Sequence, residues 1–388
     1  MGKKLGIAIV GVGGAVGTTM AAGVELLRQG AIDRTGLPLA DIEADDMAAY
    51  DDIVIAGWDL FAADLAAAAA DHEVLSHKQF VNAEAALKAI TPWPAVGDVR
   101  FLANIEGSHR LTDHTHRLVI ERLRTNISEF RSRCDSVVVI NLASTEKLAS
   151  GYTEAFSSLK AFDAALDSNS ENISPAMLYA YASIAEGVPY GNFTPSAAAD
   201  IPALIEFAEL RGVPIAGKDG KTGQTFIKTV LAPALRSRAL RVDGWYSTNI
   251  LGNRDGLALS NEGSLASKLM TKSSVLDEIL GYDVEDHIVD IRYYRPRGDN
   301  KEAWDNIDIS GFLGQQMQIK VNFLCKDSIL AAPLAIEIAR CLDLAHTQGR
   351  KGIQEQLSVF FKLPMTVSGS PEHAFHTQEQ MLLDWLRK

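Results

Sequence analysis

Short apolar runs alternate with stretches of helical spacing over the first 225 residues. Brief, nearly continuous apolar runs are typical of strands that are buried on both faces of a parallel sheet. Such runs are found at 5–10, 51–58, 136–142 and 213–216. Apolar or small residues at helical spacing predict helices over 18–28, from 62 to about 70, and over 177–184. This alternation predicts a doubly wound α/β domain.

The pattern changes after residue 226 or so. Strand-like runs at 242–248, 287–295 and 316–324 are separated by loops and by one predicted helix around 264–280. Because these three runs come with only one predicted helix, we predict an inserted α+β domain over 226–326, built on a more antiparallel sheet.

Helical spacing returns from residue 327, and it predicts helices over 328–345 and 353–363. These helices resemble the first part of the chain more than the insert. We therefore expect residues 1–225 and 327–388 to form one domain, from which the insert projects.

Composition and charge exclude several classes of function. Hydrophobic residues make up 47% of the chain and charged residues 22%, which excludes a disordered chain. The net charge of -12 argues against nucleic acid or a membrane surface as a partner, because both require a basic face. The three cysteines lack metal-binding or redox spacing, as expected of a reduced, cytoplasmic protein. No stretch can span a bilayer, and glycines interrupt the apolar start, which excludes a signal peptide.

A glycine-rich turn, GVGGAVG at 11–17, lies between the first predicted strand and the first predicted helix. Small residues there allow a pyrophosphate to approach the backbone and the helix N-terminus, as in dinucleotide-binding folds. The spacing departs from the common GxGxxG fingerprint, because Val16 stands where the third glycine is expected. The alternative is a tight turn that binds no ligand.

Asp59 directly follows the second predicted strand. An acidic residue at this position can hydrogen-bond the adenosine ribose and favours NAD over NADP. Asp59 lies farther along the chain than the usual separation of ~20 residues from the glycine motif. It could equally cap the helix that follows.

The segment 217–225, GKDGKTGQT, follows the predicted strand at 213–216. Its GKT suggests a P-loop, but a P-loop requires a further glycine where Ile215 stands. Nucleoside triphosphate hydrolysis is therefore excluded. A loop with two lysines and several hydroxyls suits a phosphate or a cofactor, and the alternative is a solvent-exposed turn.

Four lysines are candidates for phosphate binding or proton transfer. Lys268 and Lys272 would share one face of a helix, where their repulsion costs ~0.2–0.5 kcal/mol unless an anion offsets it. Lys301 ends the segment GDNK, and Lys362 stands among apolar residues, where burial would suit an amine to acid–base chemistry. The alternatives are a solvated helix face and a lysine that extends to solvent.

The run 109–116 is rich in histidine and could suggest a metal site. On a helix, His109, Asp113 and His116 would share one face. No further cluster of ligand-type residues supports a metal, so we predict a solvated amphipathic helix here and no metal site.

Taken together, these segments resemble the myo-inositol-1-phosphate synthase family over nearly the whole chain. The stretches that carry the resemblance are, in order, GVGGAVG, AGWD, NLASTE, EGVPYGNFTPS, AGKDGKTGQT, LGNRDG, SKLMTKSSV, GDNK, KDSILAAPL and FFKLP. The resemblance implies a Rossmann-type NAD-binding domain, completed by the C-terminal segment, with an inserted catalytic and tetramerisation domain. GVGGAVG lacks the paired asparagines of many eukaryotic members, which indicates a compact prokaryotic type.

The same resemblance implies an isomerase and a homotetramer. Members of the family oxidise glucose 6-phosphate at C5 with NAD, form an enolate at C6, close the ring by aldol attack on C1, and reduce C5 again. The product is 1D-myo-inositol 3-phosphate, and the cofactor is regenerated. This places the protein in inositol and phospholipid biosynthesis.

Residue roles are carried over by motif. Lys268 would handle the proton of the C5 hydroxyl, and Lys362 would protonate the C1 oxygen during ring closure. Lys272 and Lys301 would hold the phosphate and developing negative charge. The residues implied for the cofactor and the adjoining pocket are Gly11, Gly13, Gly14, Ala15, Val16, Gly17, Asp59, Leu142, Ala143, Ser144, Thr145, Asp219, Thr222, Asn253, Asp255, Gly298, Asp299, Asp327 and Ser328.

Two other classes of function use the same first domain. One is a conventional NAD-dependent dehydrogenase, acting on a small phosphorylated or amino-acid substrate and releasing NADH. The other is a nucleotide-binding protein without chemistry. The four lysines favour the isomerase, because a simple dehydrogenase needs only one general base beside its cofactor.

Overall fold

The computed structural model describes residues 2–42, 44–102, 107–147, 153–252 and 275–387. Within them, one sheet has the strand order β11-β6-β5-β4-β1-β2-β3, and every pairing in it is parallel. The strands are β1 (Leu5–Val10), β2 (Ile53–Asp59), β3 (Trp93–Pro94), β4 (Ser136–Asn141), β5 (Tyr190–Asn192), β6 (Pro214–Gly217) and β11 (Gly352–Ile353). The chain winds outward from β1 in both directions, which confirms the predicted doubly wound fold.

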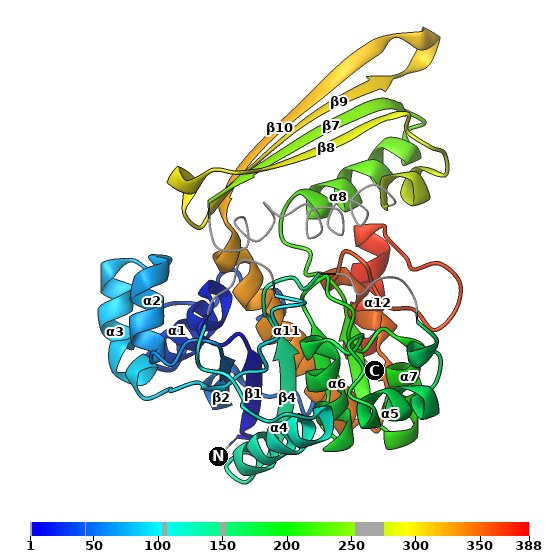
Figure 1. Ribbon diagram of the computed structural model, residues 1–388. Helices are drawn as coiled ribbons and strands as arrows, with labels where there is room; N and C mark the ends of the chain where they lie inside the picture. Colours follow the sequence, from blue (N-terminus) through cyan, green and yellow to red (C-terminus); the bar gives the residue numbers. More distant parts are fainter. Residues whose placement is uncertain (1, 43, 103–106, 148–152, 253–274, 388) are drawn as a thin grey trace.

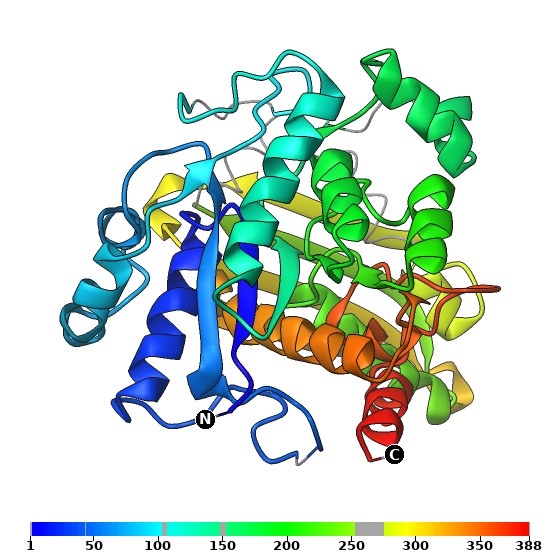
Figure 2. The same cartoon turned by 90° about the horizontal axis from the view of Figure 1, so that it is seen from below.

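Helices cover both faces of this sheet (Figure 2). The helices α1 (Ala15–Arg28) and α11 (Asp327–Thr347) lie on one face, and α4 (His116–Arg131) and α6 (Pro175–Ala185) lie on the other. Further helices are α2 (Leu65–His72), α3 (His77–Lys88), α5 (Leu159–Asp167), α7 (Pro202–Arg211), α8 (Gln224–Ser237) and α12 (Phe375–Leu386), and residues 275–280 are also helical.

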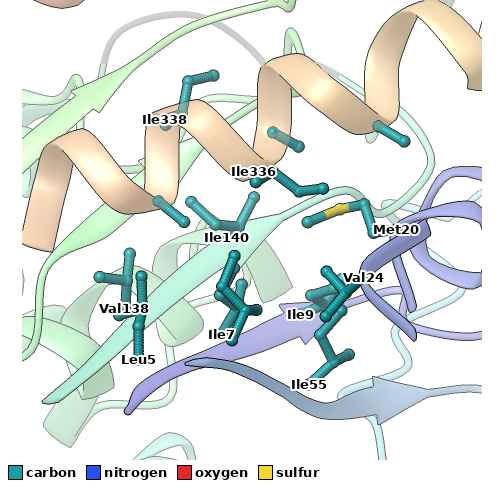
Figure 3. Close-up of a cluster of buried hydrophobic side chains, with 14 of the residues drawn as sticks. Leu5, Ile7, Ile9, Met20, Val24, Ile55, Val138, Ile140, Ile336 and Ile338 are labelled. Carbon is teal, nitrogen blue, oxygen red and sulfur yellow. The ribbon is translucent and has the colours of Figure 1, made fainter. Parts of the chain in front are cut away.

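Strand β1 is apolar throughout because its side chains alternate between two cores. Leu5, Ile7 and Ile9 pack against Met20 of α1 and Ile336 of α11 (Figure 3). Ala8 and Val10 pack on the opposite face, in the core that includes residues of α4 and α6. Burial on both sides explains why this strand could be recognised from its sequence.

A smaller sheet has the order β10-β9-β7-β8 and lies beyond the end of the larger one (Figure 1). Its strands are β7 (Arg241–Leu251), β8 (Asp286–Tyr293), β9 (Asn300–Ser310) and β10 (Gln316–Lys326). Two of its three pairings are antiparallel, and β7 pairs with β8 in parallel. Helix α8 packs on one face, where Leu235 joins the core around Trp245. The predicted change to a more antiparallel architecture is thus confirmed.

Several elements differ from the sequence predictions. The helix predicted over 353–363 is wrong: β11 is followed by a 3-10 helix, Glu355–Phe360, and then by extended chain. The backbone N–H of Lys362 donates to the Asp219 carbonyl at 2.7 Å, so this segment is hydrogen-bonded to the loop that follows β6. Helix α12 was not predicted. Of the helix predicted around 264–280, residues 275–280 are helical, and the rest lies outside the described residues.

No helix in the described part of the chain is long and apolar enough to cross a membrane.

Candidate active site

A cavity of about 460 Å³ opens at the carboxyl ends of β1, β2 and β4 and reaches β9 and the start of α11. Ligands bind at this edge of doubly wound sheets, where the winding direction reverses. Most of the predicted site residues line it: Gly11, Gly13, Gly14, Ala15, Val16, Gly17, Asp59, Leu142, Ala143, Ser144, Thr145, Asp219, Thr222, Lys301, Asp327, Ser328 and Lys362.

The other predicted residues are placed differently. Asp299 lies behind the cavity, where its carboxylate accepts hydrogen bonds from the backbone N–H of Ser328 at 3.3 Å and from its hydroxyl at 2.8 Å. Gly298 precedes it at the end of a 3-10 turn, with a left-handed φ of 54°. Asn253, Asp255, Lys268 and Lys272 lie outside the described residues.

The glycine turn carries the backbone from β1 into α1. Gly11 has a φ of 84°, which favours glycine, and its N–H donates to the Trp58 carbonyl at 2.8 Å. A Cβ on Gly17 would lie 2.4 Å from the Val12 carbonyl oxygen. Gly17 therefore allows α1 to pack closely against the turn that follows β1, a role like that of the third glycine of the usual motif.

Asp59 holds this turn. Its carboxylate accepts hydrogen bonds from the N–H of Gly13 at 2.9 Å and from the N–H of Phe61 at 3.0 Å. The capping alternative is wrong, because Asp64 caps α2, accepting from two N–H groups of its first turn. Asp59 therefore lies where the sequence predicts a cofactor-binding carboxylate.

Lys362 forms a buried ion pair with Asp219. The Nζ atom lies 2.7 Å from Oδ1, and the residues are 7% and 3% exposed. Backbone hydrogen bonds join their segments, because Lys218 N–H also donates to the Leu363 carbonyl at 2.8 Å. Lys362 is thus held inside the cavity wall and does not extend to solvent.

A second cation lines the same cavity. Lys301 Nζ lies 3.4 Å from Asp327 Oδ1, which also accepts from the Thr222 hydroxyl at 3.0 Å. Lys301 is on β9, Thr222 on the loop before α8, and Asp327 at the start of α11. Among the described residues, two lysines therefore line the cavity, and each is paired with a carboxylate.

Neither lysine of the loop 217–225 lines the cavity, contrary to the predicted loop with two phosphate-binding lysines. Lys218 pairs with Asp200 at 2.6 Å, and Lys221 is buried against Gln378, to which it donates. Burial lowers the pKa of Lys221 to about 7. The loop contributes Asp219 and Thr222 to the cavity instead.

Several polar residues that line the cavity were not predicted, among them His72 and Glu146. His72 Nε2 lies 2.8 Å from the Gly13 carbonyl oxygen. Glu146 accepts from the Ala176 N–H at 2.9 Å, and burial raises its pKa to about 7. Glu146 is the last residue of the stretch NLASTE. Neither His72 nor Glu146 belongs to a spacing pattern that would identify it as a site residue from the sequence.

The helix predicted over the histidine-rich run is wrong, because α4 begins only at His116, with Thr115 as its cap. His109 Nε2 lies 3.1 Å from the Pro92 carbonyl, and His116 Nε2 lies 3.0 Å from the Ser170 carbonyl. These two residues therefore share no helix face with Asp113. Among the described residues, no group of three possible ligands could hold a metal ion.

The sequence model of myo-inositol-1-phosphate synthase matches residues 37–387. The chain belongs to the myo-inositol-1-phosphate synthase family. Inositol-3-phosphate synthase 1 of Bacteroides thetaiotaomicron is 43% identical to it, over 99% of this chain and 95% of that protein.

Solved structures agree with this membership. Inositol-3-phosphate synthase from Caenorhabditis elegans has a TM-score of 0.92 at 25% identity, covering 100% of this chain and 86% of that one. A myo-inositol-1-phosphate synthase-related protein from Thermotoga maritima has a TM-score of 0.83 at 25% identity, covering 99% and 98%.

The family confirms three predictions from the sequence. The cofactor is NAD, the protein is an enzyme, and its activity is that of an isomerase of inositol biosynthesis. The conventional dehydrogenase is not favoured.

The residues of the cavity fit NAD. The turn at 11–17 leaves the backbone bare at the start of α1, and a Cβ on Gly13 would lie 3.0 Å from Asp59 Oδ2. In the same cavity, the buried Oδ2 of Asp219 has no hydrogen-bond partner among the described residues. A hydroxyl or amide of a bound ligand would supply the missing donor.

Proposed function

We propose that the chain converts D-glucose 6-phosphate to 1D-myo-inositol 3-phosphate in this cavity. The observation that carries the proposal is that two lysine–carboxylate pairs line the same cavity as the glycine turn. A dinucleotide site alone would suit a dehydrogenase. Cations beside it suit a phosphorylated substrate and steps in which oxyanions form and are protonated.

The cofactor and pocket residues named from the sequence are proposed to serve this reaction. When bound, NAD supplies a hydride acceptor that is restored by the end of each turnover. The glycine turn and Asp59 would hold it, together with 142–145, which follow β4 beside the turn. Asp219 would orient Lys362 and bind a ligand hydroxyl or amide through Oδ2.

The four candidate lysines are proposed to have different roles in the reaction. Lys362 would hold the proton that the C1 oxygen takes up as the ring closes, because Asp219 keeps its ammonium group in place. Lys301 would bind phosphate and stabilise negative charge, and the family resemblance gives Lys272 the same role. Lys268 would handle the proton of the C5 hydroxyl. The roles of Lys268 and Lys272 rest on the family resemblance alone.

Regeneration of the cofactor tests the proposal. With NAD far below the glucose 6-phosphate concentration, we expect many product molecules per molecule of NAD and no accumulation of NADH. Product and NADH would be measured in the same sample. NADH formed in a one-to-one ratio with product would contradict the isomerase and support the dehydrogenase.

We also propose that residues 226–326 form an inserted domain on which the chain assembles as a homotetramer. The face of the smaller sheet opposite α8 carries exposed apolar side chains, Tyr246, Ile288, Trp304 and Leu324. Exposed apolar clusters of this kind mark protein interfaces. The net charge and the absence of a membrane-spanning helix among the described residues suit a cytoplasmic enzyme, which would supply inositol for phospholipids.

Light scattering at micromolar concentration should therefore give about four times the chain mass of 42.0 kDa. Trp304→Glu should lower this mass, because it places a charge within the proposed interface. A wild-type protein that stays monomeric would contradict the assembly.

A further inference from the structure

A buried polar cluster lies between α8 and the smaller sheet, outside the cavity. Its centre is Asp305 of β9, which is 3% exposed. Along β9 the inward-facing residues Ala303, Ile307 and Ile309 are apolar, and Asp305 interrupts them. Burying a carboxylate in a core lowers folding stability unless its oxygens accept hydrogen bonds.

Asp305 receives three kinds of donor. Its Oδ1 accepts from the Trp245 indole N–H at 2.7 Å and from the Ser247 hydroxyl at 2.7 Å. The Gln224 amide nitrogen lies 3.1 and 3.2 Å from its two oxygens. On its other side, Gln224 accepts from the Asn249 amide. The orientation of the Gln224 amide is therefore set from both ends.

A buried cation accompanies this carboxylate. Lys228, one helical turn after Gln224, is 1% exposed, and its Nζ lies 2.6 Å from His287 Nε2. Its Nζ also lies 5.6 Å from the Trp245 ring centroid. Burial lowers the pKa of Lys228 to about 8, and the charge of Asp305 opposes this. The cluster thus has its own charge compensation and does not draw on the lysines of the cavity.

Gln224 connects the cluster to the active site. It is the first residue of α8, and Gly223 precedes it. A Cβ on Gly223 would lie 3.7 Å from Lys301 Nζ, and Thr222 contacts Asp327 beside that lysine. A shift of the Gln224 side chain would therefore move the start of α8 relative to Lys301.

We propose that Asp305 is a positioning residue for the substrate. Through Gln224, it fixes the first turn of α8 against Lys301, so that the phosphate of glucose 6-phosphate meets a preformed set of donors. This inference rests on the proposed function, and no role for Asp305 follows from the family motifs quoted above.

Asp305→Asn tests the proposal. The new side chain keeps an acceptor for Trp245 and Ser247, but its NH2 group then faces the NH2 group of Gln224. Gln224 must turn and lose its bond from Asn249, or move. We expect KM for glucose 6-phosphate to rise about 10- to 100-fold, with a much smaller change in kcat and an unchanged Kd for NAD.

A second substitution restores the pairing. In Asp305→Asn/Gln224→Glu, the new amide donates to the new carboxylate, which also accepts from Asn249. KM should fall well below that of either single variant. Asp283→Asn removes an exposed carboxyl of the same domain and should behave as wild type.

The outcomes are distinguishable. A wild-type protein that does not turn over glucose 6-phosphate refutes the proposed function itself. An active wild type with an unchanged KM in Asp305→Asn overturns the positioning role. An equal loss of kcat and of NAD binding in Asp305→Asn would also overturn it, because it would indicate a general folding defect. A double variant in which the KM increases of the two single variants simply add would overturn it as well.

Discussion

Lys362→Met is expected to lower turnover of glucose 6-phosphate by ~10²–10⁴-fold, the usual cost of removing a positioned proton-transfer group. Methionine keeps most of the length and apolar volume of lysine but cannot hold a proton. If Lys362 acts at ring closure, the earlier oxidation should still occur. Absorbance should then show reduced cofactor that stays bound to the variant after substrate is added.

Loss of the ammonium group also leaves Asp219 buried without its partner. Breaking a buried ion pair by removing one member typically costs ~3–5 kcal/mol of folding stability. Lys362→Met/Asp219→Asn removes both charges, so it should regain stability in denaturant unfolding and remain inactive. Lys78→Met, on an exposed face of α3, should match the wild type in both measurements. Near-normal turnover in Lys362→Met would remove this lysine from the mechanism.

Gly13→Ala is expected to weaken NAD binding by at least about tenfold, through loss of a hydrogen bond and of room for the cofactor. The added Cβ would lie 3.0 Å from Asp59 Oδ2, so the carboxylate must move and its 2.9 Å bond to the Gly13 N–H is disturbed. Kd for NAD would be measured by calorimetric titration of the free protein, which does not depend on catalysis.

The same helix provides a matched control. Gly23 lies in α1 with open space around its Cβ position. Gly23→Ala should leave the NAD affinity unchanged and stabilise the protein by ~0.5–1 kcal/mol, because alanine is the better helix former. Equal affinities for NAD in the two alanine variants would show that the turn at 11–17 does not hold the cofactor.

The sequence predicts elements best where burial is uniform. Strand β1 was predicted over its full length, because both of its faces are covered and every residue is apolar. Strand β9 was missed, because its buried face includes Lys301 and Asp305, which obscure the apolar alternation of a strand. The segment 353–363 has helical spacing, but its backbone pairs with the loop that carries Asp219.

The site residues were likewise predicted only in part. Motif order identified Lys301, Lys362 and Asp219 as site residues, and the fold brings all three to one cavity. Which side chain pairs with which depends on contacts between distant segments, such as Lys362 with Asp219, and no local pattern encodes them. The loop 217–225 shows this limit, because its two lysines face away from the cavity.

The most direct test of the central claim is phosphorus NMR of the product formed from glucose 6-phosphate and a catalytic amount of NAD. The account predicts that the substrate signal is replaced by that of 1D-myo-inositol 3-phosphate, while the total of NAD and NADH stays constant and NADH does not accumulate. Persistence of the glucose 6-phosphate signal, or its conversion to an oxidised sugar phosphate with matching NADH, would contradict it.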